Sequence, residues 1–112
     1  MTKDELIAAL NSEDQFKEIW IYGQSGQSIC ALINGDVGWL MYLRWSGDAG
    51  YSTRNPDESS KDDIEYMLSN GQMDYYPKKW AYPIVRLKQA LCSFIDNGEL
   101  PDQLTWHDDS SN

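Results

Sequence analysis

The chain has 112 residues, of which 41% are hydrophobic and 24% charged, proportions typical of an ordinary globular protein, so we expect one domain over residues 1–112. Eighteen acidic residues against nine basic ones give a net charge of −9. Nucleic acid and anionic membrane surfaces repel such a chain, whereas a basic protein partner is attracted to it. Direct binding to nucleic acid or to a membrane is therefore not expected.

The first segment, MTKDELIAAL, predicts a short helix over about residues 3–12. Thr2 is followed three positions later by Glu5, which is the spacing of a capping box. The segment lacks the basic start and the long apolar run of a secretory signal. We therefore expect a cytoplasmic protein.

Three segments with a period of two residues follow, and they predict an antiparallel meander. The first is FKEIWIY, at residues 16–22. The second, SICALI, ends at Asn34-Gly35, a dipeptide that favours a type I′ hairpin turn. DVGWLMYLRW, at residues 36–45, then forms the returning strand.

Further strands are predicted beyond the turn SGDAG. GYSTR, at residues 50–54, can pair back onto the meander. IEYML and QMDYY flank Asn70-Gly71 and give another hairpin signal. Counting these segments, the sheet has about five or six strands.

The clearest helix signal lies between Pro83 and Gly98, where apolar residues recur at helical spacing and Pro101 follows. The predicted fold is therefore α+β, an antiparallel sheet with a long C-terminal helix packed on one face and a short N-terminal helix. LTW, at residues 104–106, predicts a short last strand, and HDDSSN, at residues 107–112, a frayed acidic tail.

Catalytic and metal-binding patterns are weak in this chain. His107 is the only histidine and adjoins the polar tail, which favours a solvated side chain over a catalytic base. Cys30 and Cys92 are expected to be reduced thiols, and with one histidine they do not provide a zinc site. GDAG is not followed by the lysine of a phosphate-binding loop. We expect no catalytic residue, no metal and no cofactor.

Five tryptophans and seven tyrosines leave three interpretations open: core packing, a carbohydrate platform, or anchors of a protein interface. Trp20 and Trp39 lie within predicted strands and are expected to be structural. Trp45, Tyr51 and Trp80 lie beside turns, where a partner could reach them.

Acidic residues are concentrated in NPDESSKDDIE, at residues 55–65, and again between Asp96 and Asp109. One interpretation is a surface that keeps the protein soluble. The other is a carboxylate patch that imitates a phosphate backbone and blocks the basic cleft of an enzyme acting on nucleic acid. Asp48, in the turn SGDAG, is interpreted either as a bond to its own backbone or as a recognition residue.

The stretches INGDVGWLMYL, GYSTRNPD, PIVRLKQALCSFIDNG and ELPDQLTW resemble, in this order, immunity protein family one, the antitoxins encoded beside polymorphic and contact-dependent bacterial toxins. The closing pattern is the most specific part: a helix leads to glycine, Leu100-Pro101, Leu104 and Trp106. In GYSTRNPD, Ser52 and the run from Asn55 to Asp57 fit the family pattern, while Arg54 stands where the family has glycine.

The resemblance implies a small α+β immunity protein without catalysis, which binds the C-terminal domain of one cognate toxin and occludes its active site. It favours a deaminase as that toxin, with a nuclease as the alternative. We expect the toxin-binding residues to be Trp45, Asp48, Tyr51, Asp57, Glu58, Asp62 and Asp63. A carbohydrate or small-molecule binding module and a small hydrolase remain the competing functions, and the oligomeric state stays open.

Overall fold

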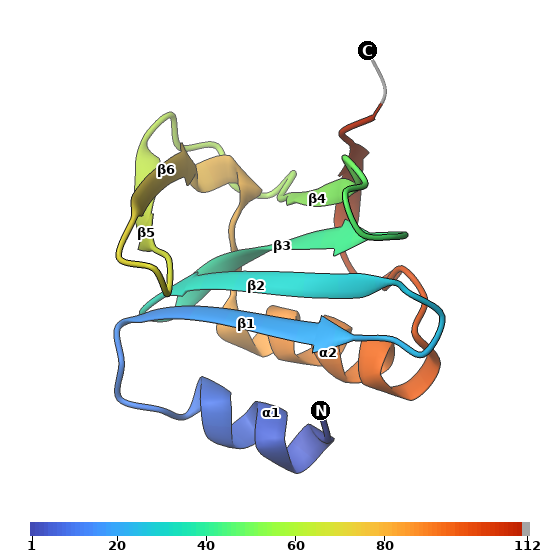
Figure 1. Ribbon diagram of the computed structural model, residues 1–112. Helices are drawn as coiled ribbons and strands as arrows, with labels where there is room; N and C mark the ends of the chain where they lie inside the picture. Colours follow the sequence, from blue (N-terminus) through green and yellow to red (C-terminus); the bar gives the residue numbers. More distant parts are fainter. Residues whose placement is uncertain (111–112) are drawn as a thin grey trace.

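The computed structural model describes residues 1–110 and contains a sheet with helices on one side and a hairpin on the other (Figure 1). In chain order the elements are α1 (Lys3–Leu10), β1 (Phe16–Tyr22), β2 (Ser28–Asn34), β3 (Val37–Leu43), β4 (Tyr51–Arg54), β5 (Asp63–Met67), β6 (Met73–Pro77), the 3₁₀ helix η1 (Lys78–Trp80), β7 (Tyr82–Pro83), α2 (Ile84–Asn97) and β8 (Thr105–Asp108).

The predicted meander is confirmed. β1, β2 and β3 are antiparallel neighbours, with Phe16 opposite Asn34 and Asn34 opposite Val37. The residues between β2 and β3 are Gly35 and Asp36, because Asn34 pairs with Val37, and Gly35 has a φ of +64°. The type I′ turn predicted at Asn34-Gly35 is therefore wrong, because such a turn needs a positive φ at both central residues and no residue other than glycine has one within residues 1–110. The predicted capping box is present as well, because Thr2 and Glu5 each bond the other's backbone N–H.

Beyond β3 the sheet divides. The order is β1-β2-β3-β4-β8, and the short β7 pairs with the same edge of β3 as β4 does, at Val37 and Gly38. Both contacts to β3 are therefore short. The last strand, β8, pairs with β4 from Thr105 opposite Arg54 to Asp108 opposite Tyr51.

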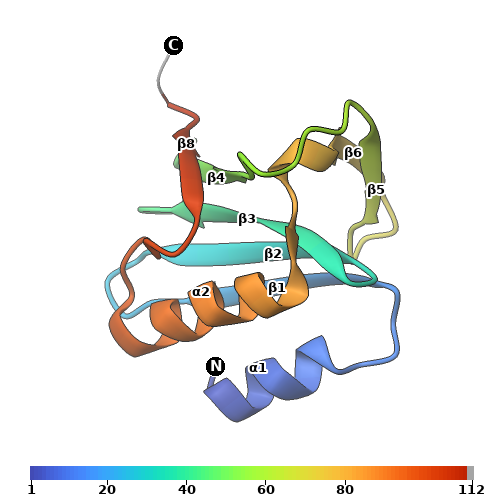
Figure 2. The same ribbon diagram turned by 180° about the vertical axis from the view of Figure 1, so that it is seen from behind.

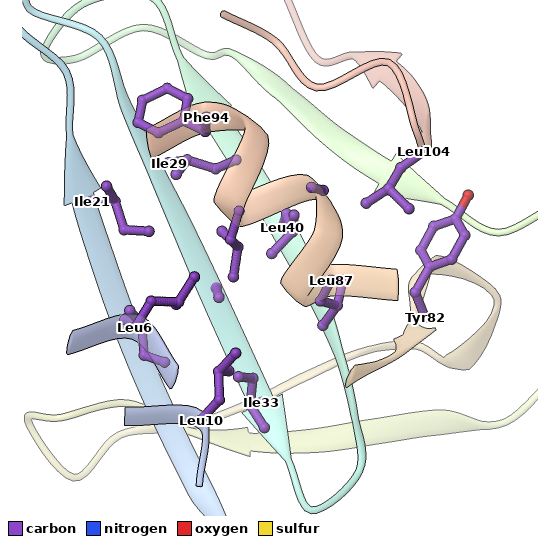
Figure 3. Packing of buried hydrophobic residues seen from close by; sticks show 14 residues of the cluster. Leu6, Leu10, Ile21, Ile29, Ile33, Leu40, Tyr82, Leu87, Phe94 and Leu104 are labelled. Carbon is purple, nitrogen blue, oxygen red and sulfur yellow. The ribbon is translucent and has the colours of Figure 1, made fainter. Parts of the chain in front are cut away.

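The main core lies between the sheet and the two helices. Strand alternation places Ile29 and Leu40 on this face, where both are fully buried. Figure 2 shows the helices in front of the sheet, and Figure 3 shows Phe94 of α2 against Ile29, with Leu6 of α1 joining at one side. Burial of this apolar face is the main source of stability, at roughly 25 cal/mol per Å².

The expectation of a long C-terminal helix is wrong, because α2 has only 14 residues, which correspond to about 21 Å. Its limits are set at both ends. Pro83 is held in β7 opposite Val37 and is the N-cap residue, so the helix begins at Ile84, and Gly98 ends it at a φ of +69°. No helix within residues 1–110 is long and apolar enough to cross a membrane.

The hairpin predicted around Asn70-Gly71 forms, but not as part of the main sheet. β5 and β6 make a separate two-stranded sheet, and the main sheet reaches six strands through β7 and β8 instead. The hairpin covers part of the face opposite the helices, where Tyr66 packs with Trp39 in a second apolar cluster (Figure 1). Burial of these rings explains why the hairpin leaves the plane of the sheet.

The predicted frayed tail is wrong at its beginning. His107 and Asp108 belong to β8, which begins one residue later and ends two residues later than LTW, and the backbone N–H of Asp109 donates to the Gly50 carbonyl at 2.9 Å. The last two positions of the predicted tail, residues 111–112, lie outside the described residues.

Candidate binding surface

The turn between β3 and β4 is closed by Arg44 and Asp48. The Asp48 carboxylate accepts the backbone N–H of Arg44 at 3.0 Å and two guanidinium N–H groups at 2.8 and 2.9 Å. Its side chain is only 2% exposed. The guanidinium holds the pKa of Asp48 well below its usual range. Asp48 therefore points into its own turn, and Arg44 is the residue that it positions.

Arg44 in turn supports two aromatic side chains. Its guanidinium carbon lies 4.5 Å from the centre of the Trp45 ring and 5.3 Å from that of Tyr51. Trp45 is 54% exposed, whereas Tyr51 is partly buried. We call Arg44, Trp45, Asp48 and Tyr51 the turn cluster. The cluster presents the exposed indole of Trp45 against Arg44, whose guanidinium is held by charge-assisted hydrogen bonds to Asp48.

Of the other predicted residues, Asp57, Glu58 and Asp62 lie in the loop between β4 and β5, and Asp63 is the first residue of β5. This loop is fixed against η1. The backbone N–H of Asn55 donates to the Lys79 carbonyl at 2.7 Å, and that of Lys78 donates to the Asp62 carbonyl at 2.9 Å. The amide of Asn55 also donates to the Ala81 carbonyl at 2.8 Å. Both ends of the loop therefore have a defined position.

We call residues 55–63, which include the first residue of β5, the acidic loop, and four carboxylates belong to it. Asp57, Asp62 and Asp63 are exposed, while Glu58 is partly buried and accepts the Ser60 backbone N–H at 3.2 Å. None of the four takes part in a salt bridge within residues 1–110. Three exposed carboxylates are thus available to a partner.

The structure does not bring all seven predicted residues together. The turn cluster precedes β4 and the acidic loop follows it, so the two groups lie at opposite ends of that strand (Figure 1). Lys61 lies within the acidic loop, and Lys78 and Lys79 lie in the adjoining η1, so positive charge borders the carboxylates. The negative surface is therefore smaller than the sequence suggests.

Trp80, predicted to be accessible beside a turn, is partly buried in a row of rings. It lies 5.8 Å from Tyr76 and 5.8 Å from Trp39, between ring centres, and the Arg54 guanidinium covers it at 3.8 Å. Trp39 is 6% exposed, as expected for a core residue. Trp20 packs at the edge of the same cluster.

Sequence reasoning missed one residue of the turn cluster and two exposed tyrosines that lie outside the predicted surface. Tyr22 and Tyr75 are 72% and 62% exposed, and Arg44 carries the turn cluster. The alternation in β1 and β6 is a signal for the tyrosines, because Tyr22 lies on the face opposite the buried Ile21 and Tyr75 on the face opposite the partly buried Tyr76. For Arg44 no local pattern exists, because its ion pair depends on the path of the turn.

The histidine and the cysteines occupy separate places. The side chain of His107 is 52% exposed, and its Nε2 lies 3.7 Å from an Asp109 oxygen that is also 3.7 Å from Arg54. Cys30 and Cys92 are free thiols, and burial raises the pKa of Cys30 to about 12. Within residues 1–110, no three His, Cys, Asp or Glu side chains are grouped as a metal site would need.

Comparison with known proteins agrees with the motifs in the chain. A family model described as Immunity protein Imm1 matches residues 2–108, which is nearly the whole chain. No curated protein matches it. The chain therefore belongs to the Imm1 family of immunity proteins, and the resemblance inferred from its sequence motifs is confirmed.

Proposed function

We propose that this immunity protein neutralises its cognate toxin by covering the toxin's active site, and that the toxin acts on nucleic acid. A deaminase is the reaction class that the sequence resemblance favours, and a nuclease is the alternative. In this proposal residues 1–112 act as one domain in the cytoplasm, without catalysis or a cofactor.

The observation that carries the proposal is the unpaired negative charge of the acidic loop on a chain of net charge −9. An enzyme that handles nucleic acid needs a basic cleft for the phosphate backbone. Asp57, Asp62 and Asp63 are exposed and free of intramolecular salt bridges. They can steer the chain toward such a cleft and form ion pairs inside it.

The turn cluster supplies the second element of the proposed interface. Interfaces draw most of their affinity from a few large anchors, and tryptophan is among the commonest of these. Trp45 has the exposure of such an anchor, and Arg44 already restricts its ring. The cost of immobilising the side chain on binding is therefore reduced. We assign Tyr51 a supporting role, and Asp48 acts by positioning Arg44.

Co-expression tests the proposal directly. The toxin domain encoded immediately upstream is expressed in bacteria with this chain or with an empty vector, and survival is scored. Survival with the chain, together with loss of deamination or strand cleavage by the purified toxin at saturating inhibitor, is the expected result. A fully active toxin under these conditions contradicts the proposal, as does binding to a glycan array without any effect on the toxin.

A further inference from the structure

A partly open pocket lies between the hairpin and the face of the sheet opposite the helices. Its volume is about 150 Å³. Cys30 and Leu32 come from β2, which lies between β1 and β3. β1 and β3 contribute further side chains to the lining, and Leu68, the residue directly after β5, contributes another.

Aromatic rings make up much of the lining. Trp20 comes from β1, Trp39 from β3 and Tyr76 from β6, so three different strands contribute one ring each. The Trp39 and Tyr76 ring centres are 4.6 Å apart. On the other side, Trp20 stacks on the exposed Tyr22 at 6.2 Å, which extends the aromatic wall into solvent.

Two carboxylates join these rings, and no basic side chain lines the pocket. Glu18 accepts the Trp20 indole N–H at 2.6 Å, and its other oxygen accepts the Ser69 backbone N–H and hydroxyl at 2.9 Å. These bonds lower the pKa of Glu18, with the Ser69 backbone as the first cause. Glu18 therefore stays ionised while it holds Trp20 and the hairpin in place.

The second carboxylate is less constrained. Asp74 of β6 accepts the side-chain amide of Gln72 at 2.8 Å and the Tyr76 hydroxyl at 3.3 Å, both neutral donors within two residues. No salt bridge within the described chain neutralises Glu18 or Asp74. The pocket thus combines π faces with two uncompensated negative charges.

We propose that this pocket receives one lysine or arginine side chain of the cognate toxin, as a contact separate from the turn cluster and the acidic loop. The inference rests on the proposed function, because it takes the toxin as the partner. A basic side chain fits better than an apolar one, because its methylene stem packs on Leu32 and Met41 while its head meets rings and carboxylates. An apolar side chain would instead bury the carboxylates without a counter-charge.

The protein already uses this mode of contact internally. Arg54 places its guanidinium 3.8 Å above the Trp80 ring, and Trp80 adjoins Tyr76 of the pocket. One end of the aromatic row is therefore occupied by a cation of the chain itself. The proposed toxin residue makes the equivalent contact at the other end.

Asp74→Asn is the decisive variant, because the amide keeps the size of the side chain and removes only its charge. Binding of the purified full chain to the upstream-encoded toxin domain is measured by calorimetry at fixed ionic strength. We expect Asp74→Asn to raise Kd about tenfold, and Asp74→Lys to raise it further. Asp102→Asn, an exposed residue between α2 and β8, is the matched control and should change Kd by about twofold at most.

The outcomes separate this inference from the proposed function. If the wild-type chain does not bind the toxin, the pocket contact and the proposed function are both wrong. If the wild type inhibits the toxin but Asp74→Asn binds as tightly as the wild type, or no more weakly than Asp102→Asn, only the pocket contact is wrong. If Asp74→Asn weakens binding as expected, alanine substitution of each toxin lysine and arginine identifies the partner residue, since the effect of Asp74→Asn should vanish in one of these variants. Coupling to an apolar toxin residue instead overturns the choice of a basic side chain.

Discussion

The buried hydroxyl of Thr53 accepts a hydrogen bond from the backbone N–H of Leu40 at 3.1 Å. It also donates to the Trp80 carbonyl at 2.9 Å. Leu40 lies between the part of β3 that pairs with β7 and the part that pairs with β4, so neither neighbouring strand satisfies its N–H. A side chain therefore completes the sheet at the point where its edge divides.

Thr53→Val should lower the free energy of unfolding by about 2 kcal/mol, because it keeps the shape of the side chain and leaves two backbone groups without partners. Urea unfolding followed by tryptophan fluorescence measures the change. A loss below the error of the extrapolation would show that water replaces the hydroxyl at this position.

Tyr66→Phe also removes one hydroxyl, but we expect it not to lower the stability of the protein. The Tyr66 hydroxyl is buried and has no hydrogen-bond partner within the described residues, and burial raises its pKa. Removing it should leave stability unchanged or increase it by up to about 1 kcal/mol. If the same urea experiment shows destabilisation as large as that of Thr53→Val, the hydroxyl has a partner such as an ordered water.

Much of the fold follows from local signals in the sequence. The capping box at Thr2 fixes the start of α1, the turn at Gly35 joins β2 to β3, and Pro83 and Gly98 set the limits of α2. Each of these signals involves residues that are close together in the sequence, so it can be recognised without knowledge of the fold. Pro83 and Gly98 also fix the length of α2, since the apolar residues at helical spacing, from Ile84 to Ile95, all lie between them.

The placement of the hairpin and of the candidate site depends on distant contacts and could not be predicted in this way. β5 and β6 alternate as the strands of the main sheet do, and contacts with distant residues, such as Tyr66 and Tyr76 in the cluster around Trp39, place them against the face of that sheet instead. Asp48 likewise stands four positions after Arg44 without a helix between them, so its ion pair depends on the shape of the turn. The sequence indicates that carboxylates are exposed in general, but it does not indicate which of them form hydrogen bonds or ion pairs within the protein.

Asp48→Asn should lower the thermal midpoint at neutral pH, because Arg44 loses its charged acceptor. The folded-state pKa of Asp48 is depressed, so its contribution to stability is present above the unfolded value of about 3.9 and is lost as pH falls through the folded value. The midpoints of wild type and variant should therefore converge in strong acid. Asp57→Asn, at an exposed carboxylate, is the control, and a pH-independent difference for Asp48→Asn would contradict this assignment.

Charge reversal in the acidic loop tests electrostatic steering toward the toxin. Asp62→Lys combined with Asp63→Lys should slow association about tenfold at low ionic strength, and the difference should shrink in high salt. Stopped-flow mixing with the toxin domain measures the rate. Glu99→Lys combined with Asp102→Lys changes the net charge equally at the other end of the molecule, and equal slowing by both pairs would mean that only total charge matters.

Trp45→Ala tests the proposed anchor of the interface. Because Trp45 is 54% exposed and contributes little to the core, the variant should fold with nearly unchanged stability, while Asp48 still holds Arg44. Loss of a central aromatic contact acts mainly on dissociation, so we expect the dissociation rate of the toxin complex to rise about tenfold or more with little change in association. Surface plasmon resonance separates the two rates. Tyr75→Ala removes an aromatic ring of similar exposure from β6 and serves as the control, since the turn cluster, the acidic loop and the pocket do not use it. If Tyr75→Ala accelerates dissociation and Trp45→Ala does not, the toxin docks on the hairpin and the turn cluster is only structural.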